Sequence, residues 1–222
     1  MKNMIEKLHY HTIKPQLKSA LDWLMAEDIF NPFRLVGGTA LSLQLGHRES
    51  VDIDMFSDLG YGDIDFEEIG THLKNNFDYV DSLDTAIVGM GKSYFIGDSA
   101  NDCIKLDLYY TDPFIRPYIE KDNIRLANLD DIVAMKVDIV SRGARKKDFW
   151  DLHELLNTYT IEKMLELHKE RYEYSHNREE IIANFINFEN ADNDFEPICL
   201  LGKFWEIIKL DFVDLIEDLG KS

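Results

Sequence analysis

Residues 51–56 (VDIDMF) constrain the fold of this chain more than any other segment. Apolar and acidic side chains alternate strictly along this run, and successive side chains of a β-strand point to opposite faces of a sheet. The run is therefore predicted to be a strand with Val51, Ile53 and Met55 on one face and Asp52 and Asp54 on the other. An isolated pair of this kind is most often a solvent-facing edge, so its meaning depends on what surrounds it.

A second alternating run, Ile104–Tyr109, is predicted to be another strand and carries Asp107 on its polar face. If the two strands pair, three carboxylates converge. Carboxylates held together repel one another unless a cation neutralises them, and Mg²⁺ prefers oxygen ligands and often bridges one or two carboxylates to substrate phosphates. Asp52, Asp54 and Asp107 are therefore candidate ligands for Mg²⁺ or Mn²⁺.

A glycine turn, Gly37-Gly38-Thr39, separates a predicted strand at 33–36 from a predicted helix at 40–46. Glycines let the backbone approach a phosphate closely, and the N–H groups at a helix start attract anions. Thr39 is placed to be the N-cap of this helix. Glycine turns before helices are common, so this turn gains significance from the acidic strand that follows it.

Residues 36–57 resemble the AbiEii/AbiGii toxin family of the DNA polymerase β-like nucleotidyltransferase superfamily. The superfamily pattern is a glycine followed by Ser, Gly or Thr, a helix, an Asp-x-Asp or Asp-x-Glu strand, and a third acid on a later strand. The family also carries a lysine in a later helix, matched by Lys136, and an R…KD motif, matched by Arg142, Lys147 and Asp148. The resemblance extends from about Leu35 to Leu156.

The resemblance implies a role for each matched residue. Asp52 and Asp54 would bind the metal, and Asp107 would complete the metal site or act as a general base. Asp148 would organise the site or the incoming nucleotide. Nucleotide binding is expected from the glycine turn and from basic residues, namely Gly37, Gly38, Thr39, Arg48, Lys136, Arg142 and Lys147.

Two of these basic groups also have simpler interpretations. Lys136 lies on an otherwise apolar helical stripe. Its ammonium either meets an anionic partner such as a phosphate, or it extends to solvent as an ordinary snorkelling lysine. Arg142, Arg145, Lys146 and Lys147 form the densest basic cluster, which either offsets a helix dipole or docks phosphates of a nucleotide or tRNA. His47 has no predicted partner, and His168 is expected at the surface.

The predicted fold class is α+β: a polymerase β-like core with a small mixed sheet flanked by helices, followed by a helical C-terminal region. The core is expected to span residues 1–126 and the helical domain residues 127–222, because the pattern changes to almost purely helical near Leu126. Pro113 and Pro117 indicate a loop just before that boundary. No apolar run approaches the length of a membrane span, and a cytoplasmic location is expected.

The function predicted from these features is transfer of a nucleoside monophosphate from an NTP to an acceptor. The family resemblance implies RNA, in particular the tRNA 3′ end, and a toxin with a cognate antitoxin in phage defence. The net charge of −18 argues against broad binding of duplexes and suits a cationic, aminoglycoside-like acceptor better. Two further hypotheses are a protein acceptor and a non-catalytic interaction protein that retains the fold.

Overall fold

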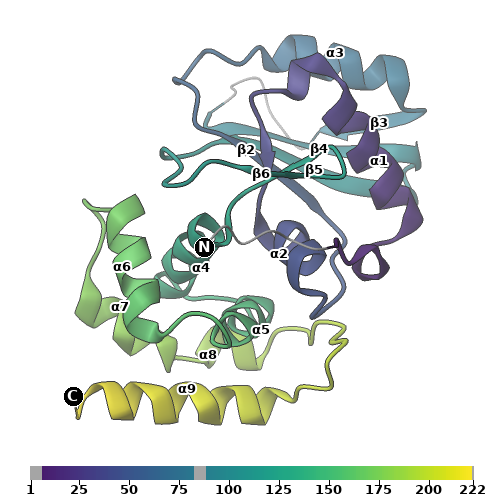
Figure 1. Ribbon diagram of the computed structural model, residues 1–222. Helices are drawn as coiled ribbons and strands as arrows, with labels where there is room; N and C mark the ends of the chain where they lie inside the picture. The colour runs from purple at the N-terminus through teal and green to yellow at the C-terminus, as the bar shows by residue number, and fades with distance from the viewer. Residues whose placement is uncertain (1–6, 83–88, 222) are drawn as a thin grey trace.

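The computed structural model describes residues 7–82 and 89–221, and within them a seven-stranded mixed sheet forms the centre of the molecule (Figure 1). Its strand order is β3-β4-β5-β2-β1-β7-β6. The strands are β1 Arg34–Leu35, β2 Ile53–Ser57, β3 Tyr79–Ser82, β4 Gly91–Ser99, β5 Asp102–Tyr110, β6 Ile119–Lys121 and β7 Ile124–Leu126. The mixed sheet flanked by helices confirms the predicted fold class.

Strands β2 and β5 are parallel neighbours in the middle of the sheet. Ile53 and Met55 of β2 and Leu106 and Leu108 of β5 are all fully buried, as the alternation predicts. The first of these strands begins at Ile53 and not at Val51, because pairing with β5 starts at Ile53 and pairing with β1 only at Met55. Val51, predicted to share a strand face with Ile53 and Met55, lies outside the strand and is 57% exposed.

Helices cover both faces of the sheet. Figure 1 shows α1 (Pro15–Ala26) and α3 (Phe66–Asn76) on one side and α2 (Gly37–Leu45) and α4 (Leu129–Ser141) on the other. The side chains of α2 from Thr39 to Gln44 are all buried, which is expected of a short helix enclosed between a sheet and further helices. Two 3₁₀ turns, Tyr10–Thr12 and Asp28–Phe30, flank α1.

Every named element after β7 is a helix in the part of the chain that is described. After α4 come α5 Lys146–Leu155, α6 Ile161–Arg171, α7 Arg178–Phe185, α8 Glu189–Asp192 and α9 Trp205–Leu219. None of the described helices is long and apolar enough to cross a bilayer. The division into domains 1–126 and 127–222 stays a prediction.

The loop 113–118 leads into a β-hairpin that the sequence interpretation missed. Strands β6 and β7 pair through a two-residue turn at Asp122 and Asn123, whose φ angles are 52° and 63°. Both residues thus have left-handed backbones, as in the tight turns that suit the twist of a hairpin. The Asp-Asn pair was the signal for this hairpin.

His168 was predicted at the surface, and that prediction is wrong. The side chain is 1% exposed because it belongs to the buried face of α6 together with Met164, Leu165 and Arg171. Its Nδ1 lies 2.9 Å from Nδ1 of His176.

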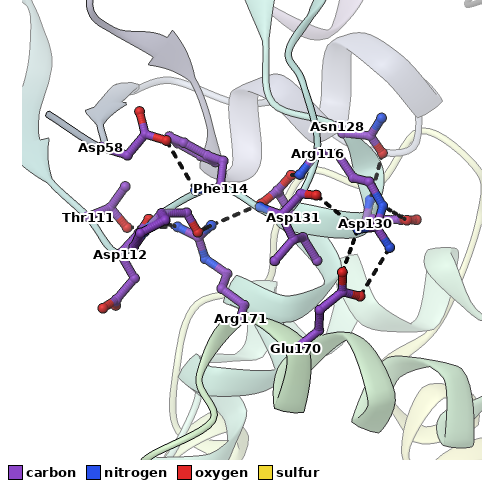
Figure 2. A network of polar contacts seen from close by, with 12 residues as sticks. Asp58, Thr111, Asp112, Phe114, Arg116, Asn128, Asp130, Asp131, Glu170 and Arg171 are labelled. Atoms are coloured by element: carbon purple, nitrogen blue, oxygen red, sulfur yellow. Dashed lines mark hydrogen bonds and ion pairs between the residues drawn. The ribbon is translucent and has the colours of Figure 1, made fainter.

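A buried ion pair joins α6 to the first turn of α4, and both of its side chains also bond to the loop that follows β5 (Figure 2). Arg171 and Asp131 are each 0% exposed at the side chain, with 2.9 Å between Nη1 and Oδ1. The guanidinium also donates to the carbonyls of Pro113 and Asp112 and to the Thr111 hydroxyl, each at 2.9 Å. The Asp131 carboxylate accepts from the backbone N–H groups of residues 115 and 116. The helical region is therefore joined to the loop that leaves β5 through two buried charged side chains.

Candidate active site

The register of the sheet brings two of the three predicted acids together. Asp54 of β2 and Asp107 of β5 are direct partners in the parallel pairing, so their side chains leave the same face on adjacent strands. Asp52 lies two residues before Asp54, in the extended segment that enters β2, and is half-buried.

The pKa of Asp54 reflects this crowding. Burial, the charge of Asp107 and the charge of Asp52, in that order, raise the pKa of Asp54 to about 6. The positive charges of Lys147 and Lys136 oppose the shift. The three carboxylates are therefore within electrostatic reach of one another, and a cation among them would be stabilising.

The carboxylate of Asp107 has partners of its own. One oxygen accepts a hydrogen bond from the Ser93 hydroxyl at 2.6 Å, and the other pairs with the Lys105 ammonium. Among the described residues, no three His, Cys, Asp or Glu side chains lie close enough together to hold one metal ion. Mg²⁺, however, usually takes only one or two carboxylates and completes its shell with waters and substrate phosphates. The oxygen donors of Asp52 and Asp54 beside an open cavity fit that requirement.

The glycine turn packs directly against these acids. Gly37 has a φ of 65°, and a Cβ there would lie 2.5 Å from Oδ2 of Asp54. A Cβ on Gly38 would clash with Nη2 of Arg48. The N–H of Val36 donates to the carbonyl of Asp54 at 2.8 Å. Gly37 thus permits the close approach of the helix start to the acidic strand, and Gly38 leaves room for the Arg48 guanidinium.

Thr39 does not have the role expected of it as an N-cap. Helix α2 begins at Gly37 with Val36 as N-cap, so Thr39 lies inside the first turn, 1% exposed. Its hydroxyl forms hydrogen bonds with the Ser50 hydroxyl at 2.8 Å and with the carbonyl of Asp52. Thr39 therefore holds the segment that presents Asp52, and its predicted contact with a triphosphate stays a prediction.

Lys136 has carboxylates as partners in this structure. Its ammonium lies 2.7 Å from Asp148 and 2.7 Å from Asp151, with all three side chains almost fully buried. Burial alone would lower the pKa of Lys136, but the two carboxylates raise it well above its usual value. The lysine stays charged, and Asp148 is fixed beside it.

Asp151 is the residue that the sequence interpretation missed. Its fully buried carboxylate accepts from Nε and Nη2 of Arg48 at 2.6 and 2.9 Å and lies 2.8 Å from Nε2 of His47. Burial alone would raise the pKa of Asp151, but the charges of Arg48 and Lys136 hold it well below the usual value. The sequence signal for a buried acid here was its position one helical turn after Asp148, between the apolar residues Trp150 and Leu152 in the predicted helix that follows the basic cluster.

A cavity of about 260 Å³ opens over these groups. It is lined by most of the predicted site residues, namely Gly37, Gly38, Arg48, Asp52, Asp54, Lys136, Lys147 and Asp148. Thr39 and Asp107 lie outside its lining. Arg142 also lies outside, at the C-terminal end of α4, where its side chain is 70% exposed and pairs with Asp138. The predicted roles of these three residues in nucleotide or metal binding stay predictions.

Lys147 contributes the uncompensated positive charge of this cavity. It is half-buried at the start of α5 and has no ion pair among the residues that the structure describes. Arg48 and Lys136, by contrast, are already neutralised by buried acids. Of these three cations, Lys147 is therefore the one that can meet a phosphate without breaking an existing ion pair.

Comparison with known proteins identifies one family. Residues 20–218 match the model of the nucleotidyl transferase AbiEii toxin, of a Type IV toxin–antitoxin system. An uncharacterised protein of Aquifex aeolicus is 27% identical over 210 residues, which cover 89% of this chain and 92% of that protein.

Two solved structures share the fold at low sequence identity. MenT4, a nucleotidyltransferase toxin of Mycobacterium tuberculosis, superposes with a TM-score of 0.57 at 16% identity, over 91% of this chain and 83% of that one. JHP933 of Helicobacter pylori superposes with a TM-score of 0.55 at 16% identity, over 94% of each chain.

Proposed function

The chain belongs to the AbiEii family of nucleotidyl transferase toxins, and from that membership we propose that it transfers a nucleoside monophosphate from an NTP to an RNA, at the tRNA 3′ end. The observation that carries the proposal is the convergence of Asp52 and Asp54 with the glycine turn and Lys147 around one cavity. The family is that of a toxin–antitoxin system, so an antitoxin is the expected partner. We extend the proposal to phage defence in the cytoplasm.

The reaction needs an acceptor hydroxyl aligned with the α-phosphorus of the NTP. The acceptor oxygen forms a bond to that phosphorus, the bond to the bridging oxygen of the β-phosphate breaks, and pyrophosphate leaves with the electron pair. The hydroxyl proton passes to Asp107 or to water. Mg²⁺ or Mn²⁺, held by Asp52 and Asp54, would neutralise charge on the triphosphate and favour ionisation of the attacking hydroxyl.

The protein's own residues position the reactants. The N–H groups at the start of α2, freed of side chains by Gly37 and Gly38, are suited to phosphate oxygens. Lys147 supplies a positive charge to the lining of the same cavity. Lys136 and Arg48 act through the carboxylates that they hold, and therefore set the shape of the cavity floor.

A labelled-NTP transfer assay tests the proposal. Purified protein, Mg²⁺ and each of four α-³²P-labelled NTPs are incubated with bacterial RNA, and labelled RNA is resolved on a denaturing gel. We expect labelling with at least one NTP, and its loss for Asp52→Ala and Asp54→Ala. Asp98→Ala is the matched control, because Asp98 is an exposed acid of β4. Labelling that persists in either site variant would contradict the mechanism.

The acidic surface favours a second acceptor class. With a net charge of −18, the protein attracts cations at long range, which suits an aminoglycoside-like acceptor better than RNA. The same labelled NTPs are therefore tested with a panel of cationic aminoglycosides. Transfer to a panel member and not to RNA would reassign the acceptor while keeping the catalytic residues.

A further inference from the structure

A second cavity of about 260 Å³ lies next to the first and shares five residues with it. The shared residues are Arg48, Ser50, Asp52, Arg145 and Lys147. The metal-binding candidate Asp52 and the cation Lys147 thus face both cavities. A reaction that joins two substrates at Asp52 needs one place for each, and the second cavity has no substrate assigned to it.

The outer wall of the second cavity comes from the C-terminal tail. Residues 194–198 line it together with residues 48–52. The tail is held there by hydrogen bonds from Glu49 N to Ile198 O and from Leu200 N to His47 O, each at 2.9 Å. Arg145 adds a two-pronged ion pair to Asp194, with both N–O distances 3.1 Å. The wall is therefore a fixed part of the fold, and none of the motifs of the first 156 residues supplies it.

The second cavity presents apolar side chains to solvent. Phe195 is 89% exposed, Ile198 60% and Val51 57%, and all three line the cavity. Large apolar side chains that gather at a concave site usually mark a binding surface. The Phe195 ring contacts no other ring among the described residues, so one face of it is free to stack.

We infer that this second cavity is the acceptor subsite, and that it binds one unpaired nucleotide of an RNA 3′ end, with its base stacked on Phe195 and its phosphate near Lys147. The inference rests on the proposed function and adds the substrate's place to it. In this arrangement the terminal hydroxyl would lie on the side of Asp52, toward the NTP cavity. The subsite adds no chemical step: the acceptor hydroxyl bonds to the α-phosphorus and pyrophosphate leaves, as in the transfer reaction described above.

The overall charge of the protein favours stacking as the source of affinity. An acidic surface cannot neutralise many phosphates, whereas stacking of one base on an aromatic ring contributes about 1–3 kcal/mol without any phosphate contact. Binding should then depend weakly on salt. With one or two phosphates neutralised, the slope of log K against log salt is about −0.7 to −1.4.

Fluorescence anisotropy of a 5′-labelled single-stranded RNA, without NTP, tests the subsite independently of catalysis. We expect Phe195→Ala to weaken binding by about 5- to 150-fold, and Phe195→Trp to bind like the wild type. Phe204→Ala is the matched control, since Phe204 is also exposed, at 71%, but does not line the cavity. In the labelling assay, Phe195→Ala should raise KM for RNA and leave KM for the NTP unchanged.

The outcomes separate the subsite from the proposed function. If the wild type labels RNA and Phe195→Ala binds RNA as tightly as the wild type does, the subsite is wrong and the transferase proposal stands. Equal weakening by Phe195→Ala and Phe204→Ala would also overturn the subsite, in favour of general apolar adhesion. If the wild type neither binds nor labels RNA, both the subsite and the RNA acceptor fail, and transfer to an aminoglycoside decides whether the catalytic proposal survives.

Discussion

Replacing Asp151 by Asn should destabilise the protein more than any other single change of an acid to its amide in the site. The carboxylate lies at 0% exposure between Lys136, Arg48 and His47, with donor distances of 2.6 to 2.9 Å. An amide keeps the shape but loses the charge, and its NH₂ group would face cations. Removing one partner of a buried ion pair costs about 3–5 kcal/mol, because the remaining charges stay buried without compensation.

Urea unfolding followed by far-UV circular dichroism measures this loss. A cost of about 3–5 kcal/mol in a chain of this length corresponds to a decrease in Tm of about 6–20 °C. The control is Asp98→Asn, which changes an exposed acid and should stay within about 0.5 kcal/mol of the wild type. A loss below about 1 kcal/mol for Asp151→Asn, with an unchanged m-value, would refute the claim that this cluster is sealed from water.

Three further outcomes follow from the same site. In EDTA at pH 7.5, Asp54→Asn should be more stable than the wild type by up to about 3 kcal/mol, because the folded-state pKa of Asp54 is raised to about 6 from 3.8. This gain in the free energy of unfolding is complete above pH 6 and disappears as the pH falls toward 4. Urea titrations at pH 7.5 and pH 4 measure it. Gly37→Ala should lower transfer activity and should destabilise the protein more than Gly62→Ala does. Both glycines have left-handed backbones, but only a Cβ at position 37 would contact Asp54. Equal losses of stability in the two variants would mean that backbone strain alone matters. Mg²⁺ at 100 times its Kd should stabilise the wild type by about 2.7 kcal/mol in thermal unfolding, and a similar gain in Asp54→Asn would place the ion elsewhere.

Local patterns were sufficient to predict the strands that carry the acids. The alternation around Asp54 and Asp107 depends on one buried face per strand, and that requirement is visible in the sequence. It does not specify the neighbour of each strand. The prediction that the acids converge therefore depended on an assumed pairing of β2 with β5, and the structure shows this pairing, with Asp54 opposite Asp107.

Residues that act across long separations were the ones missed. Asp151 bonds to Arg48, 103 positions away, and no period of helix or strand encodes such a contact. Residues 198–200 pair with 47–49 in the same way, as main-chain bonds that any side chain would permit. Thr39 matched a capping pattern, but the tight turn at Gly37 started the helix earlier than the pattern indicates.

The hydrogen bonds from Arg171 and Asp131 to the loop after β5 have a consequence for how the molecule opens. Since Arg171 of α6 and Asp131 of α4 both hydrogen-bond to the loop that leaves β5, the C-terminal helices cannot detach from the sheet without stripping these partners from two buried charges at once. Amide protons of β5 and α6 should then exchange with deuterium through one shared opening, with a single free energy, and not as two separate foldons. Protease cleavage within α6 would thus report on the global unfolding of the sheet.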